Sequence, residues 1–239
     1  MNHLYIVGTP IGNLGDITLR ALEVLKSVNF ILCEDTRTAK KLLTKYDIGT
    51  KTISYHMYSK ISKVAEIIGL LKEGKNLALV SDAGTPGISD PGAELVATIR
   101  KEYLRELEKG ELRIEPVPGP SALIAALSIA GVPCASFTFL GFLPRKKGRK
   151  TLFEEIAVSD KTIVFYESPH RIMKTFESLA ECSTLNEISI KSGLKRITVC
   201  RELTKVFEEV VSGSAVEVKK YFESRPDKIR GEFVVIVSK

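Results

Sequence analysis

The sequence predicts an α/β protein of two domains. Its 239 residues are enough for one large domain or two small ones. In the first half, short apolar runs alternate with helical patterns, which predicts a largely parallel sheet with helices on both faces. Three prolines within 116–120 then interrupt the chain. We therefore expect an N-terminal α/β domain over 1–117 and a C-terminal α/β domain over 118–239, the latter with a mixed sheet and helices.

The elements of the first half follow from periodicity and from their end signals. Apolar residues at 19, 22 and 25 predict a helix that Asp16 or Thr18 can cap, and Gly74 ends another helix. The expected strands are 4–7, 29–33, 53–55, 77–80 and 113–117. The expected helices are 19–26, 36–46, 61–72 and 92–109.

The second half has a different spacing. Ser121 is placed to cap a helix over 122–130. The strands expected at 197–202 and 206–212 are close enough to form a hairpin, which predicts a mixed sheet. Further strands are expected at 136–140, 161–166 and 232–237, and further helices at 151–157, 171–182 and 215–224.

Composition narrows the class of protein. No apolar run approaches the ~20 residues of a membrane span, and the N-terminus lacks the pattern of a signal peptide. The four cysteines form no Cys-x-x-Cys pair, so neither a zinc knuckle nor a disulfide framework is expected. These features favour a reducing cytoplasm. A net charge of +6 and a pI near 9.0 suggest a polyanionic partner.

Two glycine-rich loops follow predicted strands. The loop 81–92 contains three glycines, two prolines and two aspartates, and ligands of open sheets bind beyond the carboxyl ends of the strands. The loop 8–16 has glycines at spacings of four and three, which do not fit the dinucleotide-binding fingerprint. Each loop alone could be a tight turn. The near-match to a phosphate-binding loop at 69–76 lacks the hydroxyl residue and joins a helix to a strand, in the wrong order.

Three charged clusters could carry chemistry, at 34–37, 166–171 and 200–205. Asp35 could instead only cap a helix. A single histidine such as His170 is often a surface or packing residue, and alternating charges at 200–205 suit a solvated face. The order of a hydrolase triad and the spacing of a zinc site are both missing from the sequence.

Basic residues occupy five of the six positions 145–150, which we call the basic loop. Phe137, Phe139 and Phe142 precede it. Such a loop can contact phosphates while nearby rings stack on bases. The alternative is a solvated loop with Phe137 and Phe139 in the core.

Several of these motifs together resemble a known family. The stretches that carry the resemblance are 4–22, 34–37, 81–92, 118–122, 141–144, 165–171 and 200–205. They resemble the bacterial 2′-O-ribose methyltransferases of small-subunit (16S) ribosomal RNA, within the tetrapyrrole methylase family. The resemblance extends from residue 4 to about 237. At His56-Met57 the chain departs from the histidine–asparagine pair that the family leads us to expect.

The resemblance implies a two-domain tetrapyrrole methylase-like fold, a homodimer, and S-adenosylmethionine (SAM) as methyl donor in a cleft between the domains. The acceptor would be a cytidine ribose in the decoding region of small-subunit ribosomal RNA, free or in the assembled subunit. The positions that would line the donor site are Pro10, Ser81, Asp82, Ala83, Gly84, Thr85, Gly87, Ile88, Ser89, Ser121, Ala122, Tyr166, Leu203 and Gly231.

The residue types suggest roles in such a reaction. A general base could be Asp35, then Glu202, with Glu167 and His170 as further candidates. Arginines and lysines could hold RNA phosphates: Arg37, Arg145, Lys146, Lys147, Arg149, Lys150, Arg171 and Arg201. A tetrapyrrole methyltransferase and a non-enzymatic RNA-binding protein remain alternatives, although the basic loop argues against the first and the two strand-end loops against the second.

Overall fold

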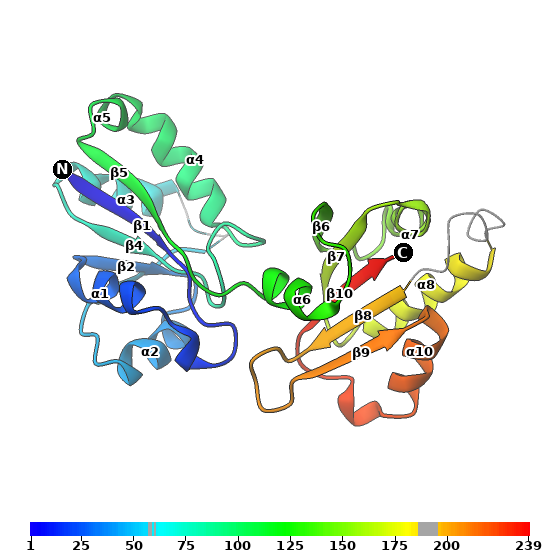
Figure 1. The fold of residues 1–239 in the computed structure, drawn as a ribbon. Helices are drawn as coiled ribbons and strands as arrows, with labels where there is room; N and C mark the ends of the chain where they lie inside the picture. Colours follow the sequence, from blue (N-terminus) through cyan, green and yellow to red (C-terminus); the bar gives the residue numbers. More distant parts are fainter. Residues whose placement is uncertain (57–58, 60, 186–195) are drawn as a thin grey trace. The chain divides into compact units, whose positions relative to one another are not determined.

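The computed structural model describes residues 1–56, 59, 61–185 and 196–239. The chain forms two compact units, 1–121 and 122–239 (Figure 1). The first unit ends at Ser121 and therefore includes the proline-rich stretch, whereas the expected boundary lay after Val117. Each unit has its own sheet and its own core.

The first unit contains a five-stranded, fully parallel sheet in the order β3-β2-β4-β1-β5. Its strands are β1 (Asn2–Val7), β2 (Phe30–Cys33), β3 (Lys51–Ser54), β4 (Leu77–Leu79) and β5 (Leu112–Val117). The prediction of a largely parallel sheet is confirmed. All five strands end at the same edge of the sheet, so the loops that follow them are brought together there.

Helices cover both faces of this sheet (Figure 1). They are α1 (Leu19–Ser27), α2 (Thr36–Lys45), α3 (Ile61–Lys72), α4 (Gly92–Glu102) and α5 (Leu104–Glu108), with a short 3-10 turn η1 (Leu14–Asp16). One core joins α1 and α2 to the sheet, and the other joins α3 and α4 to its opposite face. The neighbouring strands β1 and β4 therefore lead to helices on opposite faces, the arrangement that opens a ligand crevice in α/β sheets.

One expected helix of the first unit is wrong. Residues 92–109 form two helices rather than one, because the backbone turns at Tyr103 (φ −118°, ψ 30°). The ring of Tyr103 is buried, and its hydroxyl donates a hydrogen bond to the Ile68 carbonyl at 2.6 Å. This contact lies 35 residues away along the chain, so local periodicity could not reveal it.

The second unit contains a mixed five-stranded sheet in the order β6-β7-β10-β8-β9. Its strands are β6 (Phe137–Phe142), β7 (Thr162–Glu167), β8 (Arg196–Arg201), β9 (Glu209–Gly213) and β10 (Phe233–Ser238). Strands β6 and β7 run parallel, whereas β10 is antiparallel to both β7 and β8, and β8 pairs antiparallel with β9. The expected hairpin and mixed sheet are confirmed.

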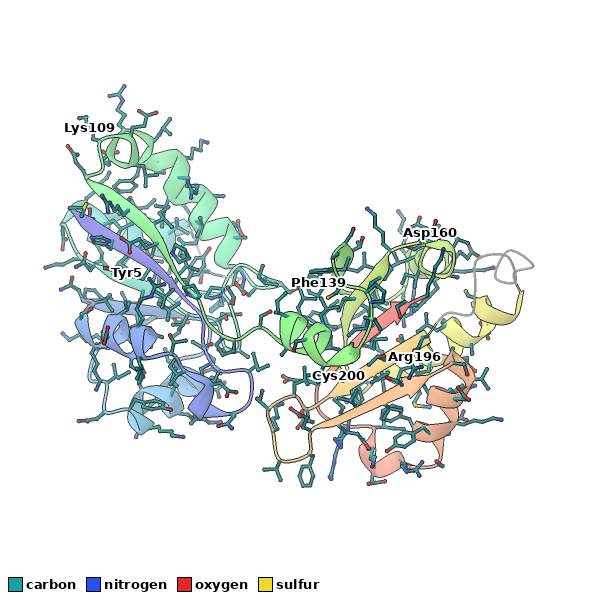
Figure 2. The ribbon with its side chains drawn as sticks, in the orientation of Figure 1. Tyr5, Lys109, Phe139, Asp160, Arg196 and Cys200 are labelled. Atoms are coloured by element: carbon teal, nitrogen blue, oxygen red, sulfur yellow. The ribbon has the colours of Figure 1, made fainter. Side chains whose placement is uncertain are left out.

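The helices of the second unit are α6 (Ala122–Ala130), α7 (Arg149–Val158), α8 (Ile172–Leu185) and α10 (Ala215–Glu223), with a 3-10 turn η2 (Pro226–Lys228). Helices α7, α8 and α10 enclose the main core, and α6 packs against β10 and β8. In Figure 2, Arg196 marks the exposed start of β8 and Cys200 a buried position near its end. Within the part of the chain that the structure describes, no helix is long and apolar enough to cross a membrane.

Two expected boundaries in the second unit are wrong. Strand β9 begins at Glu209 rather than at 206, because Glu202 and Thr204 have positive φ angles (51° and 66°) and turn the chain out of the sheet. Helix α7 begins at Arg149 rather than at 151, because Gly148 (φ 78°) forms a left-handed cap before it. The last two residues of the basic loop therefore belong to a helix.

Candidate active site

The loops that follow β1 and β4 lie together. Thr9 and Gly84 form an antiparallel bridge, with N···O distances of 2.9 and 3.1 Å in the two directions. The buried hydroxyl of Thr9 lies 3.1 Å from the Ser81 carbonyl oxygen. The two glycine-rich loops thus form one assembly at the switch point of the sheet.

Asp90 fixes the conformation of the loop 81–92. Its carboxylate accepts hydrogen bonds from the backbone N–H of Gly87 (2.8 and 2.9 Å) and of Gly92 (2.8 Å). Gly84, Gly87 and Ser89 all have positive φ angles, between 66° and 88°. The loop is thus preformed by its own residues. Asp90 is not among the site residues predicted from the sequence, although an aspartate two residues before a helix start is a common turn signal.

The loop 118–121 adds a third wall. The hydroxyl of Thr85 donates to the Pro120 carbonyl oxygen at 3.2 Å. A Cβ atom on Gly84 would lie 3.4 Å from Ile11 Cγ2 and 3.6 Å from that same oxygen. A side chain at Gly84 would therefore lie between the three loops, in contact with the other two.

The predicted donor-site residues of the first unit are all on these loops. Pro10, Ser81 and Gly84 are buried, Thr85, Gly87 and Ser121 are half-buried, and Asp82, Ala83, Ile88 and Ser89 are exposed. The loops thus present backbone groups and small side chains rather than cations. Gly74 ends α3 with a φ of 74°, which confirms its prediction as a helix cap.

Gly8 and Gly119 allow two backbones to touch at the base of the loops. A Cβ on Gly8 would lie 2.8 Å from Gly119 Cα, and a Cβ on Gly119 would lie 2.8 Å from the Gly8 oxygen. We expect Gly8→Ala to lower the free energy of unfolding of the first unit by about 1–3 kcal/mol, because the chain has to move apart. Denaturant titration of the purified protein measures this change.

Gly69→Ala is the matched control, since Gly69 lies within α3 and its added Cβ meets nothing within 4 Å. We expect that variant to gain about 0.5–1 kcal/mol. Equal effects of both substitutions would contradict the close approach of the two backbones.

Asp35 lies at the carboxyl end of β2 and caps α2, accepting a hydrogen bond from Arg37 N at 2.8 Å. Its side chain also pairs with the Arg37 guanidinium at 2.6 Å, and this arginine lowers the pKa of Asp35 from 3.8 to about 2. Asp35 N donates to Asp82 Oδ1 at 3.2 Å, which connects the ends of β2 and β4. Burial, together with the negative charge of Asp82, raises the pKa of the neighbouring Glu34. An acidic rim, formed by Glu34, Asp35 and Asp82, thus borders the loops.

The second unit brings Glu202, Leu203 and Gly231 together. Glu202 Oε1 accepts hydrogen bonds from Lys205 Nζ (2.8 Å) and from Glu232 N (3.0 Å). Burial alone would raise the pKa of Glu202, but these bonds and the charge of Lys205 lower it. A Cβ on Gly231 would collide with this carboxylate, so Gly231 also has a structural reason to be glycine.

Tyr166, near the end of β7, is half-buried on the α6 side of the sheet. Its ring makes edge contacts with Phe139 (4.9 Å between centroids) and with Phe142 (5.4 Å). Burial raises the pKa of its hydroxyl, and a hydrogen bond with the backbone of Leu123 opposes this. Phe142 is 58% exposed, whereas Phe137 and Phe139 are half-buried.

The candidate cations divide into two groups. Arg145, Lys146, Lys147 and Lys150 are exposed, and Arg37 is exposed but paired with Asp35. Arg149, Arg171 and Arg201 instead turn inward. Arg201 is 4% exposed and donates to the Phe207 carbonyl at 3.1 Å. Arg149 and Arg171 pair with Glu167, whose side chain is fully buried, so Glu167 is not open to a substrate. His170 is exposed.

Comparison with known proteins identifies the family. The sequence profile of the tetrapyrrole (corrin/porphyrin) methylases matches residues 3–219. The chain belongs to the tetrapyrrole methylase family. The resemblance seen in the motifs is confirmed. The change at Met57 concerns a residue outside the described part of the chain.

Curated members of this family are similar over nearly the whole chain. Proteins named ribosomal RNA small subunit methyltransferase I are 44% identical in Halalkalibacterium halodurans, 45% in Bacillus subtilis and 43% in Thermotoga maritima. The matches cover 98%, 99% and 100% of this chain, and 75%, 75% and 99% of the relatives.

Solved structures of the tetrapyrrole methylase family share the fold. A uroporphyrin-III C-methyltransferase from Thermus thermophilus, complexed with S-adenyl homocysteine, has a TM-score of 0.64 at 16% identity and covers 100% of this chain and 98% of its own. A cobalt precorrin-4 methyltransferase has a TM-score of 0.62 at 19% identity and covers 99% of this chain and 94% of its own. These likenesses confirm the predicted two-part α/β fold. Among the described residues, no group of three or more His, Cys, Asp or Glu side chains could hold a metal ion.

Proposed function

We propose that this protein transfers a methyl group from SAM to the 2′-oxygen of a cytidine in the decoding region of small-subunit ribosomal RNA. The observation that carries the proposal is the identity of 43–45% over nearly the whole chain with enzymes named for this RNA. Two features of the structure support it, namely the glycine-rich loops gathered at one end of the parallel sheet and the exposed cations Arg145, Lys146 and Lys147.

The three loops of the first unit suit SAM, a donor without phosphate. Backbone groups around Gly84 and Gly87 can reach the adenine and the amino-acid part of the donor, since neither residue has a side chain in the way. The acidic rim favours the positively charged sulfonium of SAM. When bound, SAM supplies a methyl group that its sulfonium has already activated. The residues of the chain therefore contribute mainly by holding the donor and the ribose in line.

Donor contacts are proposed for Pro10, Ser81, Asp82, Ala83, Gly84, Thr85, Gly87, Ile88, Ser89 and Ser121 in the first unit, and for Ala122, Tyr166, Leu203 and Gly231 in the second. The expected donor cleft between the domains remains a prediction. For the RNA backbone we propose Arg37, Arg145, Lys146, Lys147 and Lys150 as phosphate ligands. We also propose a homodimer that acts in the cytoplasm.

Asp35 is the first proposed base and Glu202 the second. With a pKa of about 2, Asp35 is a weak base, so it would take the proton late, once the methyl group has begun to move. We expect Asp35→Asn to lower the single-turnover rate by about tenfold or more. The loss should be the same throughout pH 6–9, because Asp35 is fully ionised in that range.

The same pKa shift affects stability. Ionised Asp35 stabilises the folded protein above the unfolded pKa of about 3.8, and this contribution is lost only as the pH falls through about 2.

The comparison uses Glu202→Gln beside Asp35→Asn, with donor and RNA affinities measured separately. Unchanged affinities with a reduced rate support a base. Rates within about threefold of the parent for both variants would eliminate the carboxylate base and leave positioning, or His170.

A tetrapyrrole acceptor is the second candidate, since the solved structures of this fold are named for such substrates. The exposed cations of the basic loop favour RNA. To find the acceptor, the protein is incubated with SAM labelled in its methyl group and with one of three acceptors: naked small-subunit RNA, isolated small subunits or porphyrin precursors. We expect label in RNA or in the subunits. Label in the porphyrin precursor alone would overturn the proposal.

A further inference from the structure

The carboxylate of Glu167, at the end of β7, is completely buried and fully hydrogen-bonded. Oε1 accepts from Ser168 N at 2.9 Å and from Arg171 Nη2 at 2.7 Å. Oε2 accepts from the Thr175 hydroxyl at 2.8 Å and lies 3.5 Å from Arg149 Nη2. Burying a carboxylate is costly unless charged partners compensate for the lost water, and here two arginines do so. We call these four residues, Glu167, Arg149, Arg171 and Thr175, the Glu167 clamp.

Both arginines of the clamp also bind the backbone just before the basic loop. Arg171 Nη1 donates to the Leu143 carbonyl at 2.9 Å, and Arg149 Nη1 donates to the Pro144 carbonyl at 3.1 Å. Arg149 itself stands at the other end, as the first residue of α7. Its guanidinium also lies 4.9 Å from the centre of the Phe153 ring and donates to the Thr175 hydroxyl at 2.7 Å. One buried carboxylate therefore fixes both ends of the segment 145–148.

The residues between these ends are exposed. Within the described residues, Arg145, Lys146 and Lys147 form no ion pair or side-chain hydrogen bond. The basic loop also begins close to Glu167. Strands β6 and β7 run parallel, and Phe142 near the end of β6 pairs with Tyr166, the residue before Glu167. The position of the three free cations thus depends on the clamp.

We infer that Glu167 is a positioning residue for RNA binding, and that Arg149 and Arg171 act through it rather than by contacting phosphates. The free cations then meet the RNA backbone from a fixed loop, which lowers the entropy lost on binding. The RNA part of this inference rests on the proposed function; the fixing of the loop does not.

Limited trypsin digestion tests the fixing of the loop without any RNA. In Glu167→Gln the shape is kept but the charge is lost, and we expect cleavage after residues 145–147 to speed up by about tenfold or more. Cleavage after Lys220, an exposed residue of α10, reports general unfolding of this unit and should stay near the parent rate. Arg149→Lys, which keeps the charge but loses the planar fork, should behave in the same way. Unchanged cleavage after 145–147 in both variants would overturn the inference.

The RNA affinity of Arg149 variants then shows whether Arg149 acts through the Glu167 clamp or contacts a phosphate directly. If Arg149 only neutralised a phosphate, a lysine would keep most of that attraction, because it carries the same charge. The clamp instead predicts that Arg149→Lys and Arg149→Ala lose the same affinity, about tenfold, and raise the RNA KM while kcat and SAM affinity stay near the parent values. Full retention of RNA affinity in Arg149→Lys would contradict the clamp. If the parent protein binds no RNA, the proposed function and the RNA part of this inference fail, and the trypsin result still decides whether Glu167 fixes the loop.

Discussion

Gly84→Val should reduce SAM affinity by about 100-fold or more, which corresponds to about 2.7 kcal/mol. A side chain at Gly84 would lie between the three loops, in contact with Ile11 and the Pro120 carbonyl, where we propose that the donor binds. It also strains a backbone held at a φ of 84°, where it exchanges two hydrogen bonds with Thr9. Isothermal titration calorimetry with SAM measures the loss directly.

Gly110→Val is the matched control for backbone strain. Gly110 has a similar φ of 70°, its added Cβ meets nothing within 4 Å, and it precedes β5 at the opposite edge of the sheet. That variant should lose stability but bind SAM with nearly the parent affinity. A folded Gly84→Val protein with unchanged SAM affinity would show that the donor does not bind between these loops.

The second large effect is expected on RNA binding. Changing Arg145, Lys146 and Lys147 to alanine removes up to three phosphate contacts. The slope of log Kd against log salt should flatten by about 0.7–0.9 for each phosphate that the loop no longer neutralises, and RNA affinity should fall on the order of 100-fold near 0.15 M salt. SAM affinity should not change. Filter binding or fluorescence anisotropy over a salt series measures both quantities.

The control removes the same charge from another surface. Arg100, Lys101 and Arg105 are exposed on α4 and α5, and their replacement by alanine changes the net charge equally. If both triple variants lose the same affinity, RNA is attracted by overall charge and not by the basic loop. An unaltered salt slope in the first variant would make the basic loop a solvated segment only.

Much of the fold could be predicted from the sequence because the signals are local. Buried strands such as β2 and β4 are short apolar runs, and Gly74 marks the end of α3 through its left-handed backbone. The two glycine-rich loops could likewise be placed at one sheet edge, since every parallel strand ends there.

Two of the errors come from contacts between residues that are distant in the sequence. The break at Tyr103 depends on a hydrogen bond to Ile68, and the inward turn of Arg149 depends on Glu167 and Thr175. A run of basic residues gives no sign of which member faces the core. The sequence also gives no sign of whether Asp35 is a general base or a helix cap. The structure shows the cap, while its role as a base awaits the rate measurements.

The central claim is that the methyl group arrives on the ribose of a cytidine, and the alkali stability of the product tests this most directly. Small subunits are methylated with labelled SAM, and their RNA is hydrolysed in alkali. A 2′-O-methyl group removes the hydroxyl that attacks the neighbouring phosphate, so the bond after a methylated nucleotide survives. We predict that the label is recovered in an alkali-stable dinucleotide that begins with 2′-O-methylcytidine. Label in single nucleotides, as base methylation would give, would contradict this account.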